Sequence, residues 1–158
     1  MPEPARIRNV AVVGHRGTGK TSLVEALLFQ TGKINRLGTV EAGTTVSDAD
    51  EDEHKRQLSI SMSLAHTDWQ GRKINLVDVP GDPSFQGEAR CALRVVEGAL
   101  VVVSGVMGLE VGTARVKKLA DDYAVDSFGS DSPAAHAAWS KVVRLCSRIR
   151  EHSESGAS

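Results

Sequence analysis

The sequence predicts an α/β domain, in which helices flank a sheet, and two observations support this. Short β-branched runs typical of buried strands alternate with stretches of helical period. The first such run leads into the glycine-rich loop "GHRGTGKTS" at 14–22, which opens a helix. With 158 residues, the chain is long enough for one domain with a core and too short for two ordinary ones.

The first elements are a strand, a loop and a helix. The apolar run "RNVAVVG" predicts a buried strand at 8–14, and "TSLVEALLFQ" predicts a helix at 21–30. We expect Leu23, Leu27 and Phe29 or Gln30 on one face of this helix. Residues 33–57 show no period and include the acidic run "DADEDE", which indicates a solvated loop rather than a metal site.

A hairpin follows. The alternation in 59–69 predicts a half-buried strand that carries Ile60, Met62 and Leu64 on one face and serines on the other. Gln70 and Gly71 suit the turn into a second strand, "INLVDV".

The remaining elements alternate between helix and strand. We expect a helix at 85–98, a buried strand at 99–108, a helix at 109–124, a Gly/Ser/Asp-rich break at 126–133 and an amphipathic helix at about 133–152. The fold class is therefore an α/β sheet with an added C-terminal helix.

Composition excludes several classes of protein. Apolar residues make up 41% and charged residues 25% of the chain, which is ordinary for a soluble globular protein. The net charge of −1 predicts no broad attraction to DNA or to a membrane surface. Without a signal peptide or a spanning segment, we expect a cytoplasmic protein, in which Cys91 and Cys146 are idle or buried free thiols.

The loop after the first strand carries the strongest chemical signal. Residues 14–21, which we call the cradle, fit the pattern G-x-x-x-x-G-K-[ST], whose backbone N–H groups surround phosphates. Lys20 would reach the β- and γ-phosphate oxygens, and the Thr21 hydroxyl would bind Mg²⁺. A chance glycine-rich turn is the alternative, which the flanking strand and helix disfavour. The candidate cofactor-binding residues here are Gly14, His15, Arg16, Gly17, Thr18, Gly19, Lys20, Thr21 and Ser22.

A second motif, "DVPG" at 78–81, ends the return strand of the hairpin. Asp78 suits the magnesium shell, and the N–H of Gly81 suits a γ-phosphate oxygen. The alternative is a simple β-turn, since Asp-Val-Pro-Gly is also a good turn sequence.

The stretches 8–32, 37–82 and 92–116 together resemble the start of the GTP-binding domain of elongation factor G, and more closely its divergent elongation-factor-G-like branch. The resemblance covers about residues 8–116 and leaves 117–158 as a divergent tail. It implies a P-loop GTPase (G domain) fold with an incomplete three-layer αβα sheet. It also implies GTP or GDP and Mg²⁺ as cofactors, and a role in translation with the ribosome as partner.

Carried over residue by residue, the resemblance places a first switch loop at about 38–59. Ser59 stands where the family has a magnesium-binding threonine, although it also suits the first polar position of the next strand. Gly17 replaces an aspartate of the cradle, and Asp82 replaces the histidine that orients the attacking water. Asp82 and Lys20 are thus the catalytic candidates, and we expect slow or absent hydrolysis, because losing the water-orienting group costs about 10²–10⁴ in rate.

Base recognition has no motif in this sequence. The family's Asn-Lys-x-Asp is absent, so guanine specificity rests on the resemblance alone. The chain could be a truncated or frameshifted product or a standalone protein. The alternatives to a GTP-binding protein are a P-loop NTPase without base preference that retains hydrolysis, and a non-enzymatic fragment or interaction module. His15 and His66 are expected to be exposed and idle.

Overall fold

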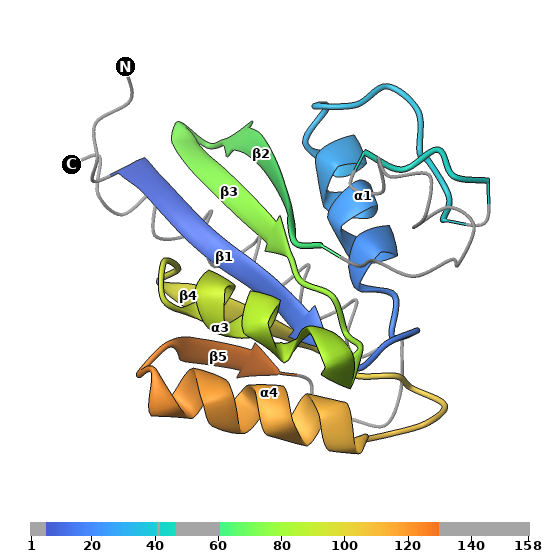
Figure 1. Cartoon of the computed structure of the whole chain (residues 1–158). Coiled ribbons are helices and arrows are strands. Elements are labelled where there is room, and N and C mark those ends of the chain that lie inside the picture. Colours follow the sequence, from blue (N-terminus) through green and yellow to red (C-terminus); the bar gives the residue numbers. More distant parts are fainter. Residues whose placement is uncertain (1–5, 41, 47–60, 130–158) are drawn as a thin grey trace.

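The computed structural model describes residues 6–40, 42–46 and 61–129. Its elements alternate along the chain as an α/β fold requires (Figure 1). In order they are β1 (Ile7–Gly14), α1 (Lys20–Gln30), β2 (Ser63–Trp69), β3 (Arg72–Asp78), a 3-10 turn (Pro83–Phe85), α3 (Gln86–Leu93), β4 (Gly98–Val102), α4 (Val111–Asp122) and β5 (Asp126–Gly129).

The five strands form one sheet in the order β2-β3-β1-β4-β5. β1 lies in the centre and pairs in parallel with both β3 and β4, while β2 is antiparallel to β3. Gln70 and Gly71 join β2 to β3 with φ values of 48° and 71°, the two positive angles that a tight hairpin turn requires. This confirms the predicted hairpin.

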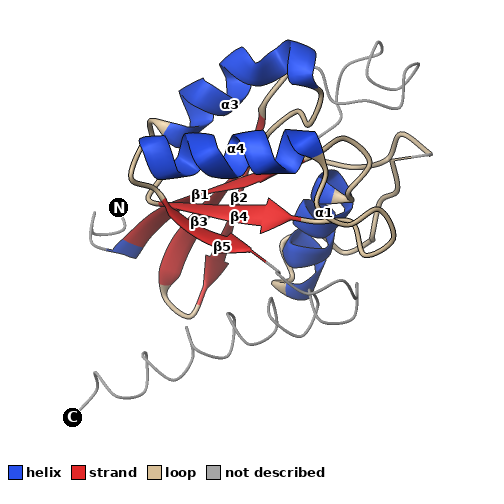
Figure 2. Cartoon of the chain, turned by 90° about the horizontal axis from the view of Figure 1, so that it is seen from below, coloured by secondary structure: helices blue, strands red, loops and turns tan. Residues whose placement is uncertain are grey.

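Helices cover both faces of the sheet, as Figure 2 shows. On one face α3 and α4 pack on a core that includes Ala11 and Val13 of β1. On the other face α1 packs through Val24 and Leu28 against Val12. Alternate residues of β1 therefore point into two different cores, which is why the buried part of this strand is continuously apolar. The predicted three-layer α/β fold is confirmed.

The buried face of α1 differs from the predicted one. Val24, Glu25 and Leu28 are buried, whereas Leu23 and Leu27 are only half-buried and Phe29 is 42% exposed. Apolar residues lie on more than one side of α1, and a polar residue, Glu25, takes one of the inward positions, so the apolar residues alone do not mark the inward face.

The buried face of β2 is also the opposite of the predicted one. Leu64 is 72% exposed and Met62 is 43% exposed, whereas Ala65 and Thr67 are buried. The Thr67 hydroxyl donates a 2.6 Å hydrogen bond to the hydroxyl of Thr31, which satisfies its polar group inside the sheet–helix contact. Ser59 and Ile60 lie outside the described residues.

Near the end of the described region, the predicted break at 126–133 is wrong for its first four residues. They form β5, which pairs in parallel with β4 along the edge of the sheet. Two predicted elements are shorter than expected, since α3 ends at Leu93 and β4 at Val102. The helix predicted at 133–152 and Cys146 lie outside the described residues, and Cys91 is a free, exposed thiol on α3.

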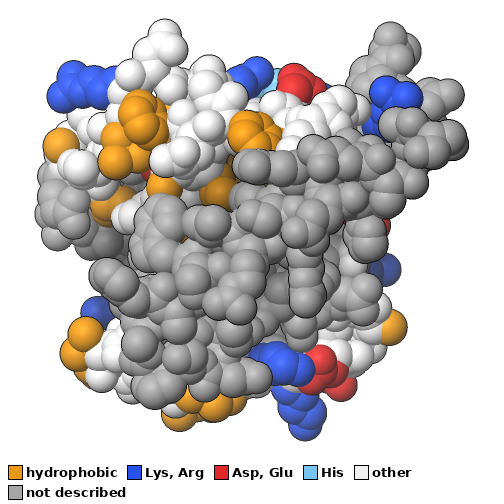
Figure 3. Space-filling model, turned by 180° about the vertical axis from the view of Figure 1, so that it is seen from behind, with side chains coloured by type: hydrophobic (Ala, Val, Ile, Leu, Met, Phe, Trp, Pro, Cys, Tyr) orange, Lys and Arg blue, Asp and Glu red, His pale blue; other side chains and the backbone are white. Residues whose placement is uncertain are grey.

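Figure 3 shows the face opposite to that of Figure 1, where charged side chains of the described residues are visible at several separate places around the edge. Within the described ranges, no helix is both long enough and apolar enough to cross a membrane.

Candidate functional site

The candidate site lies at the carboxyl ends of two neighbouring strands. β1 ends at Gly14 and continues into the loop that opens α1, and β3 ends at Asp78. The parallel register pairs Val12 with Asp78, so the glycine-rich loop and the "DVPG" motif emerge side by side. This edge of a parallel sheet is where α/β folds bind ligands.

The loop conformation depends on glycine at the point where α1 begins. Gly19 is the N-cap residue of α1 and has a φ of 84° in the left-handed region, which side chains disfavour. No side chain among the described residues caps this end of the helix, and its first turn holds no acidic residue. The first N–H groups of α1 therefore favour an anion.

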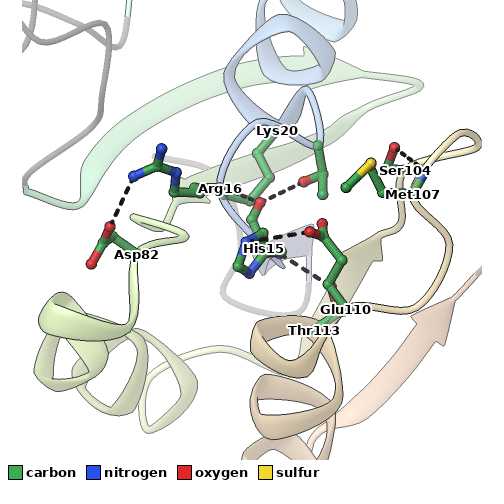
Figure 4. A network of polar contacts seen from close by, with 9 residues as sticks. His15, Arg16, Lys20, Asp82, Ser104, Met107, Glu110 and Thr113 are labelled. Atoms are coloured by element: carbon green, nitrogen blue, oxygen red, sulfur yellow. Dashed lines mark hydrogen bonds and ion pairs between the residues drawn. The ribbon is translucent and has the colours of Figure 1, made fainter.

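Lys20 lies across the loop that precedes it. Its side chain is only 7% exposed, and its Nζ donates a 3.0 Å hydrogen bond to the carbonyl of His15 (Figure 4). Burial lowers the pKa of the Lys20 ammonium, and the nearby Asp78 carboxylate opposes that shift. A buried ammonium of this kind gains from a negatively charged ligand.

Thr21 and Asp78 are joined directly. The Thr21 hydroxyl donates a 2.7 Å hydrogen bond to Oδ2 of Asp78, and both side chains are buried. A hydroxyl and a carboxylate oxygen are ligands of the type that Mg²⁺ prefers. The two predicted metal ligands from separate elements thus meet, while the third, Ser59, lies outside the described residues.

Gly81 fits closely against the loop. A Cβ built on Gly81 would collide with Lys20 Nζ and would lie 2.6 Å from the backbone nitrogen of Arg16. The structure therefore requires glycine here, because any side chain would fill the space between the "DVPG" motif and the cradle.

Asp82 is engaged in two contacts. Its Oδ1 accepts a 2.9 Å hydrogen bond from the backbone N–H of Ser84, which caps the 3-10 turn, and its Oδ2 lies 3.6 Å from the guanidinium of Arg16. The Ser84 hydrogen bonds, with a smaller contribution from Arg16, lower the pKa of the Asp82 carboxyl. At neutral pH Asp82 is an ionised and weakly basic group beside the cradle.

His15 is not the exposed, idle residue that the sequence predicts. It is half-buried, and its Nε2 lies 3.5 Å from a carboxylate oxygen of Glu110. Its backbone N–H donates a 3.2 Å hydrogen bond to the hydroxyl of Thr113 in α4 (Figure 4). These contacts join the cradle to the β4–α4 loop and to α4, 98 residues along the chain, and no local pattern could have revealed them. His66 is exposed as predicted, and its Nε2 lies 3.1 Å from Lys33 Nζ.

Four other predicted loop residues lie at or near the surface of the loop. Arg16, Gly17 and Ser22 are exposed at the rim, and Thr18 closes the loop with a 2.8 Å hydrogen bond from its hydroxyl to the carbonyl of His15. Among the residues that the structure describes, no group of three or more His, Cys, Asp or Glu side chains could hold a metal ion.

Comparison with known proteins assigns the family. The family model described as "Elongation factor Tu GTP binding domain" matches residues 5–128, most of the chain. The chain belongs to this family of GTP-binding domains. The matched range reaches beyond Val116, where the visible resemblance ends, and takes in α4 and most of β5.

Relatives of this GTP-binding domain include translation factors. An elongation factor G-like protein of Mycobacterium tuberculosis is 44% identical over 110 residues, covering 70% of this chain and 15% of that protein. Elongation factor G of Ehrlichia chaffeensis is 38% identical over 123 residues, covering 78% of this chain and 18% of the relative. The chain therefore spans less than a fifth of the length of these relatives, and its domain is elongation-factor-G-like.

Solved structures support the same fold. A crystal structure of a protein from Thermus thermophilus superposes with a TM-score of 0.72 at 42% identity, covering 75% of this chain and 18% of that one. A bacterial selenocysteine-specific elongation factor superposes with a TM-score of 0.63 at 22% identity, covering 90% of this chain and 24% of its own, which supports the fold alone.

Proposed function

We propose that this domain binds Mg·GTP and Mg·GDP in the loop 14–22. The single observation that carries the proposal is the meeting of Thr21 with Asp78 at 2.7 Å, directly beside the buried ammonium of Lys20. The ammonium of Lys20 and the hydroxyl of Thr21 come from the start of α1, and the carboxylate of Asp78 comes from the end of β3. Together these groups can bind the phosphates and the metal ion of a metal-bound triphosphate.

Each group has its own role in this proposal. Lys20 and the first N–H groups of α1 hold phosphate oxygens, while Thr21 and Asp78 hold Mg²⁺. The metal ion, when bound, neutralises phosphate charge. The N–H of Gly81 is assigned to a γ-phosphate oxygen, an assignment supported by the close fit of Gly81 against Lys20 and Arg16. Ser59 remains a candidate third protein ligand.

A titration separates the proposed function from its alternatives. Labelled GDP, ADP and tripolyphosphate are each titrated into the full chain with and without Mg²⁺. Strong preference for GDP supports a guanine-nucleotide site, which the family relationship favours. Equal binding of GDP and ADP supports a P-loop NTPase without base preference. Binding of none of the three would overturn the proposal and favour an interaction module.

We further propose that hydrolysis is slow. Asp82 stands where the resemblance places a water-orienting histidine, and it is held by Ser84 and Arg16. Those contacts lower the pKa of Asp82, so its carboxylate is a weak base for an attacking water. Its negative charge also opposes the approach of a phosphate. We propose the ribosome as a partner only because the chain is similar to elongation factor G.

Restoring a histidine tests the hydrolysis proposal. We expect Asp82→His to raise single-turnover GTP hydrolysis by about 10²-fold with ribosomes present, because a positioned general acid–base group contributes this much. Asp82→Asn is the control, since it removes the charge and the Arg16 ion pair without supplying a base. Ordinary multiple turnover by the wild-type chain would contradict the proposal.

A further inference from the structure

Glu25 is a charged side chain buried in α1 that the site described so far does not use. It is 1% exposed and stands four residues after Thr21, on the same face of the helix. Its Oε1 accepts a 3.0 Å hydrogen bond from the backbone N–H of Gly38, and its Oε2 accepts one of 3.0 Å from the N–H of Val46. One carboxylate thus holds both ends of a single chain segment.

The held segment, which we call the anchored segment, comprises residues 38–46, of which residue 41 is outside the described region. It closes on itself through a 3.2 Å hydrogen bond from the Thr44 N–H to the Thr39 carbonyl and another from the Thr39 N–H to the Thr44 hydroxyl at 3.1 Å. In Figure 1 the chain leaves α1 and returns beside it. The anchored segment is therefore a compact loop whose attachment to α1 includes Glu25.

The choice of a carboxylate at this position needs a reason. Burying an ionised carboxylate is costly unless hydrogen bonds compensate, and an apolar residue would fill the same space beside Val24 and Leu28 without that cost. The two amides of the anchored segment supply the compensation. Glu25 therefore fixes where this segment lies, in addition to filling a core position.

Gly38 shows the same fit from the opposite side. A Cβ on Gly38 would collide with the carbonyl of Thr44 and would lie 2.7 Å from Oε1 of Glu25. The backbone of the anchored segment can therefore reach the carboxylate only if residue 38 has no side chain.

We propose that Glu25 is a positioning residue that ties the start of the first switch loop to the helix that carries Lys20 and Thr21. This inference rests on the proposed function, because the anchored segment is the beginning of the range 38–59 that the resemblance assigns to that switch loop. By holding the anchored segment on α1, Glu25 keeps this segment on the helix that carries Lys20 and Thr21, and this contact slows nucleotide release.

The test compares Glu25→Gln with Glu97→Gln in the full chain. Glu97 also accepts a backbone N–H, that of Asn9 at 2.6 Å, near the start of β1 and away from the cradle. We expect Glu25→Gln to release labelled Mg·GDP about tenfold faster, because its amide nitrogen faces one backbone N–H and loses a charged hydrogen bond. Glu97→Gln should release it at the wild-type rate, even where it unfolds at a lower temperature.

Hydrogen exchange provides a readout that does not depend on nucleotide. In the free protein, the amides of Gly38 and Val46 should exchange about tenfold faster in Glu25→Gln, and Gly38→Ala should reproduce the effect at Val46. Wild-type exchange and release rates in Glu25→Gln would overturn the inference alone. Faster exchange with unchanged release would overturn the link to nucleotide. Failure of the wild-type chain to bind nucleotide would instead overturn the proposed function.

Discussion

The phosphate loop (residues 14–22) and the anchored segment (residues 38–46) flank the same helix, α1, but different contacts hold them in place. The phosphate loop closes on itself, because the Lys20 ammonium and the Thr18 hydroxyl both donate to the carbonyl of His15, three to five residues away. The anchored segment depends on Glu25, which lies 13 residues before Gly38 and 21 before Val46. Internal hydrogen bonds close both loops, but the phosphate loop follows β1 directly into α1, whereas the anchored segment is held on α1 by a carboxylate distant in sequence.

This difference means that the two loops should be separable by mutation. Changes within the phosphate loop should remove nucleotide binding and leave the anchored segment in place. Changes at Glu25 should free the anchored segment and leave the phosphate contacts intact. The Glu25→Gln variant tests the anchored segment, and the predictions below test the phosphate loop, from the largest expected effect to the smallest.

Lys20→Met should have the largest effect. It removes the buried ammonium and keeps a side chain of similar length, so we expect affinity for Mg·GDP to fall by about 100-fold. The free protein should unfold at the same or a higher temperature, because a desolvated charge is gone. Fluorescence titration and thermal unfolding measure both. Lys33→Met, at an exposed lysine beyond α1, is the control, and equal affinity loss there would contradict the prediction.

Gly81→Ala should have a smaller effect on binding. The added methyl group collides with Lys20 and the backbone of Arg16, so the "DVPG" motif must move away from the cradle. We expect affinity to fall by about tenfold and the free energy of unfolding by about 1–3 kcal/mol, the usual cost of overpacking. Gly87→Ala in α3 is the matched control, since its Cβ meets nothing within 4 Å. A wild-type affinity in Gly81→Ala would show that the close fit is unimportant.

The pH dependence of stability should show the smallest effect. Because burial lowers the pKa of Lys20, the unfolded state binds more protons than the folded state between the folded pKa and the ordinary lysine value of 10.5. The wild-type free energy of unfolding should therefore rise with pH through this window relative to that of Lys20→Met. Chemical denaturation at a series of alkaline pH values measures the difference. Parallel pH profiles of the two proteins would contradict it.

The sequence predicts the strand, loop and helix around residues 14–22 because the signals for these elements are local. The apolar strand, the glycines and the Lys20-Thr21 pair act within one β–loop–α unit, and the structure brings Asp78 to Thr21 because β1 and β3 are neighbours. The hairpin turn at Gln70 and Gly71 was predictable for the same reason.

The features that the sequence does not predict depend on distant partners. Glu25 lies inward, where its carboxylate accepts hydrogen bonds from two amides far along the chain, while Leu23 and Leu27 are only half-buried. In β2, Thr67 lies inward, where its hydroxyl donates a hydrogen bond to that of Thr31, and Leu64 lies outward. Apolar periodicity cannot predict that a polar residue is buried when its hydrogen-bond partner comes from another element.

Hydrogen exchange with and without Mg·GDP is the most direct test of the central claim that phosphates bind at 14–22. On adding Mg·GDP to the full chain, the account predicts slower exchange of the amides at 14–22, with the far end of α4 unchanged. Exchange of the Gly81 amide should be slowed only with a non-hydrolysable Mg·GTP analogue, because the proposed function assigns this amide to the γ-phosphate. Binding of Mg·GDP without any slowing at 14–22 would contradict the account.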